Sequence, residues 1–265
     1  AQNGRPGPVL IDVPMNFQKT EIKEHELKRF KAPKKNINKD LLKKNIKKIY
    51  SVLRNSSRPV ILLGGGVKIA KVQNNINKFL KKLDVPVVTT WSGVDILDHD
   101  NRNYIGNVGV YGSRAANFAV QNSDFLLCLG SRLDTRITGG VPSSFARKAK
   151  IISVDIDKHE LSKKRGLKLF LKINSNLSDF FYMINKENKK FEYKNSTWLN
   201  KCVNWKKKYP IVKDEYYSQK KYVNPYVFIN ELSKILDKKS VVIADDGGHL
   251  TWTIQSFKVK KGQKL

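Results

Sequence analysis

DFLLCLGSRLDTRITGG, residues 124–140, is the stretch that decides the fold class of this 265-residue chain. Its first part, residues 125–129, is apolar at every position, which is typical of a strand buried on both faces of a parallel sheet. Its second part sets two arginines and an aspartate among apolar residues and ends in two glycines. Because ligands bind beyond the carboxyl ends of strands in open parallel sheets, this charged part predicts a binding edge.

Similar apolar runs alternate with helical patterns on both sides of this stretch. Strands are predicted at residues 59–64, 85–90, 124–130, 148–157 and 168–173, and helices at 40–55, 72–83, 113–123 and 176–184. This alternation predicts an α/β fold with a doubly wound, Rossmann-like parallel sheet, which forms a central domain over residues 41–185.

The segments outside this domain differ from it in composition. They are predicted as an N-terminal unit (1–18), a charged linker (19–40), a helical, lysine-rich connector (186–222) and the start of a further unit (223–265). Short strands are predicted in the two outer units, at 8–13 and 240–246, and a helix at 226–236. Both outer units are expected to be parts of larger domains.

The net charge of +28 raises the question of nucleic-acid binding. Only 10 of the 51 basic residues are arginine, and the lysines are spread along the chain instead of gathering in one aromatic-rich patch. We therefore interpret them as a solvated surface and expect no nucleic acid as partner. No apolar run reaches the roughly 18 residues of a membrane span, so no membrane is expected either. Two distant cysteines, Cys128 and Cys202, suit a reducing compartment and predict a cytoplasmic protein.

Four predicted strands end in residues that suit a ligand. These are Gly64, Gly65 and Gly66; Thr90 and Trp91; Gly130, Ser131 and Arg132; and Asp155 and Ile156. Glycines let a backbone approach a ligand closely, arginines pair with phosphates, and a carboxylate after a strand accepts from a ribose hydroxyl. Each feature also has a simpler interpretation: a tight glycine turn, an ion pair between Arg132 and Asp134, and helix capping by Asp155 and Asp157.

The strings SDFLLCLGSRLDTRITGG (123–140) and FARKAKIISVDIDKHEL (145–161) closely resemble the central domain of acetolactate synthases and their relatives among thiamine diphosphate-dependent enzymes. GRPGPVLIDVPMNFQ (4–18) looks like the end of that family's pyrimidine-binding domain, and VVIADDGGHLTW (241–252) looks like the start of its diphosphate-binding domain. The resemblance therefore covers nearly the whole chain.

In acetolactate synthases the central domain holds FAD in an extended pose, and the flavin does no net redox work in acetolactate formation. The resemblance implies FAD contacts from the strand-end residues and from a linker arginine: Arg29, Gly64, Gly65, Gly66, Thr90, Trp91, Gly112, Gly130, Ser131, Arg132, Asp134, Arg136, Asp155 and Ile156. One departure concerns the family's methionine-histidine-glycine turn, which stands here as Val110-Tyr111-Gly112.

Near the end of the chain, Gly247, Gly248 and His249 match a turn that holds the thiamine diphosphate oxygens in the family. A glycine turn that opens a helix offers free N–H groups and a positive dipole end to a diphosphate. The family usually has glutamine where Gly248 stands. An ordinary helix start, in which His249 contacts no ligand, is the simpler interpretation of this turn.

The resemblance also places essential parts outside this chain. The glutamate that activates the cofactor and the Mg²⁺ ligands would lie before and after it, so no catalytic or metal-binding residue is assigned and the isolated chain is expected to be inactive. The implied partners are a 2-keto acid, a second copy in a homodimer or homotetramer, and a regulatory subunit. Two alternatives remain: a related thiamine diphosphate-dependent decarboxylase or sugar-pathway lyase without flavin, and a non-catalytic basic module that binds nucleic acid.

Overall fold

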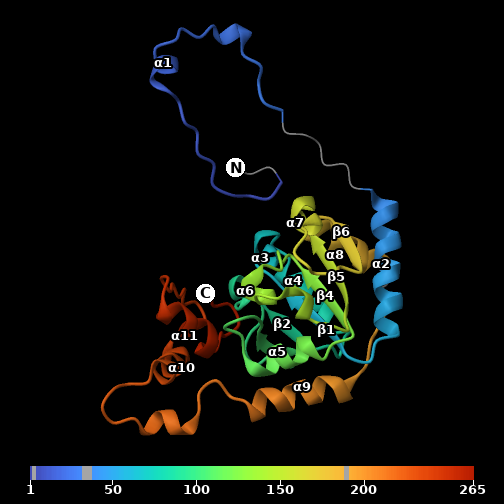
Figure 1. Cartoon of the computed structure of the whole chain (residues 1–265), viewed down its shortest axis with the longest axis vertical. Coiled ribbons are helices and arrows are strands. Elements are labelled where there is room, and N and C mark those ends of the chain that lie inside the picture. The colour runs from blue at the N-terminus through green and yellow to red at the C-terminus, as the bar shows by residue number, and fades with distance from the viewer. Residues whose placement is uncertain (2–3, 32–37, 188–190) are drawn as a thin grey trace.

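The computed structural model describes residues 1, 4–31, 38–187 and 191–265, and its centre is one parallel sheet. Six strands lie in the order β3-β2-β1-β4-β5-β6 (Figure 1). Their bounds are β1 Pro59–Leu63, β2 Val87–Thr89, β3 Tyr104–Asn107, β4 Phe125–Leu129, β5 Lys150–Asp155 and β6 Leu171–Asn174. All five pairings are parallel, so the predicted doubly wound α/β fold is confirmed.

Helices and short helical turns connect and flank the strands. Their bounds are α1 Met15–Gln18, η1 Glu24–Glu26, α2 Lys39–Arg54, α3 Gly66–Ile69, α4 Gln73–Leu80, η2 Trp91–Gly93, α5 Arg114–Gln121, α6 Thr135–Thr138, η3 Pro142–Ser144, α7 Lys158–Ser162, α8 Leu177–Glu187, α9 Ser196–Lys208, η4 Asp214–Ser218, α10 Pro225–Ile235 and α11 Gly248–Ser256. The four helices predicted for the central domain are present as α2, α4, α5 and α8.

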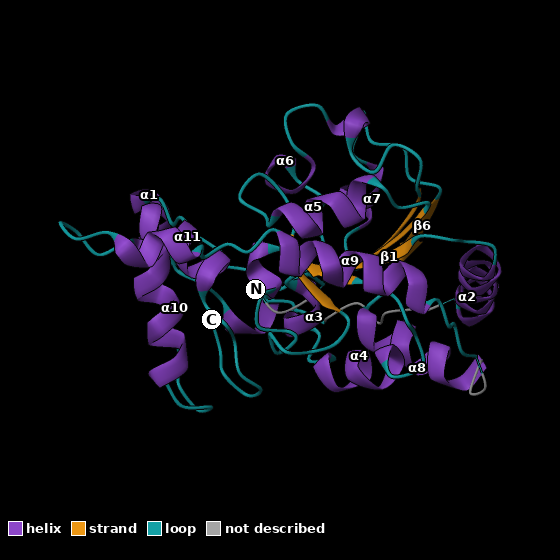
Figure 2. Cartoon of the chain, turned by 90° about the horizontal axis from the view of Figure 1, so that it is seen from below, coloured by secondary structure: helices purple, strands orange, loops and turns teal. Residues whose placement is uncertain are grey.

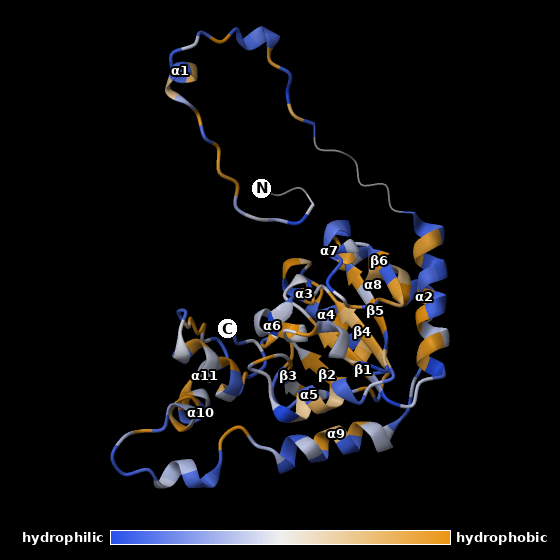
Figure 3. Cartoon of the chain, in the orientation of Figure 1, coloured by the Kyte–Doolittle hydropathy of each residue, from blue (hydrophilic) through white to orange (hydrophobic). Residues whose placement is uncertain are grey.

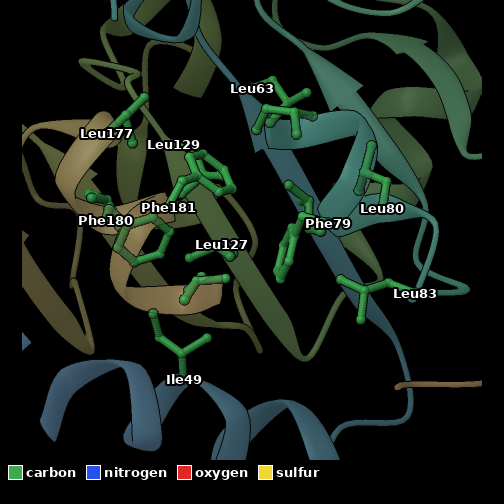
Figure 4. Close-up of a cluster of buried hydrophobic side chains, with 14 of the residues drawn as sticks. Ile49, Leu63, Phe79, Leu80, Leu83, Leu127, Leu129, Leu177, Phe180 and Phe181 are labelled. Carbon is green, nitrogen blue, oxygen red and sulfur yellow. The ribbon is translucent and has the colours of Figure 1, made fainter. Parts of the chain in front are cut away.

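Side chains that alternate along each strand divide between two cores, one on each face of the sheet. Ile61 and Leu63 pack with side chains of helices α2, α4 and α8. Figure 2 shows α4 and α8 together on one side of the sheet. Phe180 and Phe181 of α8 lie at the centre of this core, beside Phe79 of α4 (Figure 4). Both faces are covered, which explains why β1 and β4 are apolar at every position (Figure 3).

The second core joins β1 and β4 to helices α5 and α9. Val60 and Leu62 of β1 pack there with alanines of α5. Helix α9 belongs to the predicted connector, and its helical character is confirmed. It also contributes buried side chains to this core, and the Trp198 indole Nε1 donates to the Pro59 carbonyl over 3.0 Å. Cys128 and Cys202 are both buried here as free thiols.

Two predicted strands are wrong, and both lie outside the sheet. Residues 8–13 are extended and exposed, with Leu10 92% exposed, and the described residues place no strand beside them. Residues 240–246 form one isolated bridge, in which Val241 pairs with Lys264. Apolar residues with β propensity become a strand only where a partner supplies a hydrogen-bond ladder, and neither segment has one within the described residues.

The C-terminal unit packs against the central domain through a few specific contacts. Helices α10 and α11 pack on each other around Ile229, Phe257 and Val259. Lys68 of α3 forms an ion pair with Asp95 over 2.7 Å, and its Nζ also donates to the Leu265 carbonyl. These contacts connect the last residues of the chain to the carboxyl side of the sheet.

Candidate functional site

The strand order reverses between β1 and β4, and we call the carboxyl ends of these two strands the crevice edge. The chain passes from β1 outward to β2 and β3, and then returns to β4 on the other side of β1. Strand connections therefore leave in opposite directions at this point, which is where doubly wound sheets bind their ligands. Gly64 follows β1 and Gly130 follows β4, so the structure brings these two predicted residues together at the crevice.

The glycines at the crevice pack on one another. The Gly64 N–H donates to the Leu129 carbonyl over 2.9 Å, and the Gly66 N–H donates to the Gly130 carbonyl over 3.0 Å. A Cβ added to Gly66 would lie 2.8 Å from the Gly130 Cα, and one added to Gly65 would lie 2.7 Å from the Ser92 Oγ. The contact between the two loops requires glycine whether or not a ligand binds, as the tight-turn interpretation predicts.

An aromatic and cationic cluster lies beside the crevice. The rings of Trp91 and Tyr111 have centroids 5.2 Å apart, and the Arg136 guanidinium carbon lies 5.5 Å from the Trp91 ring centroid. The Trp91 Nε1 is buried and has no hydrogen-bond partner in the described residues. Thr90, the predicted neighbour of Trp91, is buried, and its N–H donates to the Leu63 carbonyl. Tyr111, which sequence reasoning did not select, therefore belongs to this cluster.

The loop after β4 holds its arginines toward solvent. Arg132 is half-exposed and lies 3.8 Å from Asp134, so the predicted ion pair is present, but at this exposure it adds little stability. Asp134 is the N-cap of α6, because its Oδ1 accepts from the Arg136 N–H over 3.0 Å. Between them Leu133 adopts a φ of 49°, a left-handed conformation that is rare for leucine. Ser131 supports it, since the Ser131 Oγ accepts from the Leu133 N–H.

Arg165 fixes this unusual loop from outside. Its Nη1 donates to the carbonyls of Arg132 and Leu133 over 2.9 and 3.3 Å, and its Nη2 donates to the Glu160 carboxylate over 2.8 Å. The Glu160 side chain is only 8% exposed and also accepts from Lys163. Arg165 thus connects the loop after β4 to the helix after β5. Sequence reasoning missed it because LSKKRG (161–166) reads as ordinary basic surface.

Asp155 and Ile156 follow β5. The Asp155 carboxylate is buried and accepts from the Asp157 N–H over 2.9 Å, and burial raises the pKa of Asp155. Asp157 caps α7 by accepting from the N–H groups of His159 and Glu160, so the capping interpretation is confirmed for Asp157 but not for Asp155. The Ile156 carbonyl accepts from Asn174. Beside Asp155 lies a cavity of about 20 Å³, lined also by Ser131 and Arg165, with room for about one water molecule.

Two further predicted flavin contacts, Arg29 and Gly112, do not follow a strand of the crevice edge. Arg29 is exposed, and no hydrogen bond or ion pair joins it to another described residue. Gly112 belongs to the turn after β3, where its N–H donates to the Gly109 carbonyl. A Cβ there would lie 2.7 Å from the Asn107 carbonyl oxygen, so this glycine is required by the turn itself. Of the two, only Gly112 adjoins the cluster, through Tyr111.

The turn at Gly247, Gly248 and His249 forms a separate candidate site. All three residues are exposed, and Gly247 has a φ of 130°, which favours glycine. Helix α11 begins at Gly248, and no side chain caps its first amides. The Gly247 N–H donates to the Asp246 carboxylate over 3.0 Å. An uncapped helix start offers N–H groups to an anion, which agrees with the predicted diphosphate contact.

Neither a metal centre nor a membrane helix is found in the parts of the chain that the structure describes. No three His, Cys, Asp or Glu side chains of residues 1, 4–31, 38–187 and 191–265 are grouped as metal ligands. No helix in these ranges is long and apolar enough to cross a bilayer.

Comparison with known proteins identifies the fold family. Residues 46–179 match the family described as thiamine pyrophosphate enzyme, central domain. The chain belongs to this family. The matched range begins in α2 and ends in α8, so it contains all six strands and every strand-end residue discussed above.

Relatives in this family extend the match to the whole chain. The chain is 33% identical to the acetolactate synthase large subunit of Cyanidium caldarium, over 100% of this chain and 46% of that protein. It is 32% identical to the probable acetolactate synthase large subunit of Methanococcus aeolicus, over 98% of this chain and 45% of that protein. It is 28% identical to the acetolactate synthase large subunit of Lactococcus lactis, over 100% of this chain and 45% of that protein. The chain thus spans less than half the length of these relatives.

Proposed function

We propose that this chain is the middle part of a thiamine diphosphate-dependent enzyme of the acetolactate synthase type. Such an enzyme removes CO₂ from a 2-keto acid and joins the remaining fragment to a second carbonyl compound. Support comes from the family membership and from relatives named acetolactate synthase along the whole chain. The proposal includes a homodimer or homotetramer, a regulatory subunit and a cytoplasmic location.

We propose further that the crevice edge binds FAD. The carrying observation is the cluster of Trp91, Tyr111 and Arg136 beside the switch point, and Arg132 is exposed on the loop after β4. Arg132 and Arg136 present charged donors that suit a diphosphate, and the unpartnered Trp91 Nε1 suits an acceptor atom of the ligand. The Asp155 carboxylate suits a ribose hydroxyl, although its burial means that only an atom entering the small adjoining cavity would reach it.

The third part of the proposal concerns thiamine diphosphate at the α11 start. When bound, this cofactor supplies the electron sink for decarboxylation. The contribution of this chain is positional, because Gly247 keeps the turn open and the amides of Gly248 and His249 donate to the diphosphate. The proton-transferring glutamate and the Mg²⁺ ligands are proposed to lie outside this chain.

A flavin titration tests the crevice directly on this chain. FAD is added to the protein, and quenching of flavin and tryptophan fluorescence measures the dissociation constant. Arg132→Ala should weaken binding by about 1.5–3 kcal/mol, the range for a hydrogen bond to a charged group. Arg147→Ala is the matched control, because Arg147 is also exposed and lies outside the crevice. Absence of FAD binding by the unaltered protein would favour the alternative, a related thiamine diphosphate-dependent decarboxylase or lyase without flavin.

Activity requires a second test. The full-length enzyme, supplied with thiamine diphosphate and Mg²⁺, should convert pyruvate to acetolactate and CO₂. The 265-residue chain alone should release no CO₂ under the same conditions, since the catalytic glutamate and the Mg²⁺ ligands are proposed to lie outside it. Release of CO₂ by the isolated chain would contradict the proposed division of the active site.

A further inference from the structure

A large cleft lies away from the crevice edge. It has a volume of about 660 Å³ and opens between the edge strand β3, helix α9 and the C-terminal unit. Figure 1 shows how α9 and the α10–α11 pair border this side of the sheet. The volume is within the range of about 300–1,000 Å³ that small-molecule sites occupy. None of the residues proposed for FAD or thiamine diphosphate lines it.

Five lysine and arginine side chains and two aspartates, Asp100 and Asp214, line the cleft, so it carries an excess of positive charge. Arg102 and Lys234 also line it, but each has a carboxylate partner, Asp84 at 2.9 Å and Glu231 at 2.6 Å. Lys206, Lys207 and Lys258 line the cleft and form no ion pair with any residue that the structure describes. The three ammonium groups repel one another in one concave surface, and Asp100 and Asp214 offset only part of this repulsion. An anion between the ammonium groups would offset more of it.

Lys206 is held at the base of the cleft. Its Nζ donates to the carbonyls of His99 and Tyr104, both over 3.0 Å, and lies 5.1 Å from the Tyr104 ring centroid. An ammonium group has three N–H donors, so these two bonds leave one donor for a ligand. Burial and the nearby Lys258 lower the pKa of Lys206 to about 8, although Asp100 opposes them. Lys206 therefore remains mostly protonated at pH 7.

We propose that this cleft binds a small phosphate-bearing molecule, with Lys206 as the fixed contact at its base and Lys258 and Lys207 as contacts nearer the solvent. Compact ammonium groups bind a phosphate as point charges, and a dianion neutralises two of them at once. The geometry favours phosphate over a planar carboxylate fork, because the unpaired groups are lysines and the one lining arginine is already bound to Asp84.

Calorimetric titration with inorganic pyrophosphate tests the proposal at constant ionic strength. Lys206→Met and Lys258→Met should each weaken binding about tenfold, the change expected from one charge-assisted contact. Lys172→Met is the matched control, because Lys172 is an exposed lysine on β6, at the opposite edge of the sheet. Its affinity for pyrophosphate should equal that of the unaltered protein.

Three results would overturn the proposal. Equal losses in all three variants would indicate general attraction to a protein of net charge +28. Unchanged affinity in Lys206→Met and Lys258→Met would place the anion at the helix start near Gly248. Citrate binding as tightly as pyrophosphate, with the same losses, would remove the assignment to phosphate. Lys258 is exposed, so its variant reports on binding even where Lys206→Met disturbs the fold.

Discussion

The crevice edge and the turn at residues 247–249 differ in how far contacts within the chain determine their shape. At the crevice, Gly64, Gly66 and Gly130 pack backbone against backbone, and Arg165 holds the next loop in an unusual conformation. At the turn, all three residues are exposed and the helix start has no side-chain cap. The same residue type therefore serves folding at one site and leaves donors free at the other.

Substitution of a crevice glycine should have the largest effect on stability. In Gly64→Val, the new Cβ would overlap the Gly130 carbonyl, so the free energy of unfolding should fall by about 3 kcal/mol. Chemical denaturation measures this change. Gly140→Ala is the control, since no atom lies within 4 Å of an added Cβ there and little change is expected. If Gly64→Val is as stable as the unaltered protein, the two loops separate easily. The crevice edge would then be no more constrained by contacts within the chain than the turn at residues 247–249.

Removal of the Arg165 guanidinium should have the next largest effect. Arg165→Ala leaves two carbonyls and the largely buried Glu160 without this donor, which should lower the free energy of unfolding by about 2 kcal/mol. Flavin affinity should fall as well, because Arg132 and Leu133 are no longer fixed. Lys164→Ala, one position away on the exposed surface, provides the comparison in both assays. An unchanged flavin affinity in Arg165→Ala would mean that the loop holds its shape without this residue.

A pH measurement examines the junction between the central domain and the C-terminal unit, where the backbone N–H of His99 donates to the Val259 carbonyl. Burial, Lys206 and Lys258 lower the pKa of His99 to about 4, and Asp100 opposes them. Unfolded His99 binds its proton near pH 6.5, so acid favours the unfolded chain and stability should fall between about pH 6.5 and 4.

Allowing for partial exposure, this loss should amount to about 1–2 kcal/mol. Urea denaturation at several pH values measures it, and His99→Gln should flatten the curve in this window. His25→Gln, a change at an exposed histidine, should leave the curve as it is. If both variants lose stability between pH 6.5 and 4 as the unaltered protein does, the junction does not exclude water from His99.

The smallest effect on stability is expected at Gly248. In Gly248→Val, the added Cβ would lie 3.1 Å from the Trp252 ring at an exposed helix start, so unfolding should change by less than about 1 kcal/mol. Binding of thiamine diphosphate to the full-length enzyme should fall much more, because a branched side chain blocks approach to the amides. Calorimetric titration of both proteins decides this, and equal affinities would make the turn purely structural.

Strands within the central domain were predictable where they are long and apolar. β1, β4 and β5 are buried along almost their whole length, and hydrophobicity alone identifies them. β3, with the sequence YIGN, was missed because it is short and contains a glycine. Residues 8–13 and 240–246 were wrongly predicted as strands because β propensity does not reveal whether a pairing partner is present.

The amino-acid sequence by itself determined the parallel sheet and the edge at which we propose a ligand, because double-sided burial and strand-end glycines are local patterns in the chain. Only the tertiary structure decided which glycines pack on each other, that Arg165 holds the loop after β4, and that Tyr111 joins Trp91. The tertiary structure also decided the cluster of Lys206, Lys207 and Lys258, because α9 and the segment after α11 are far apart in sequence. Such contacts depend on how distant segments meet, and no local pattern of residues encodes that.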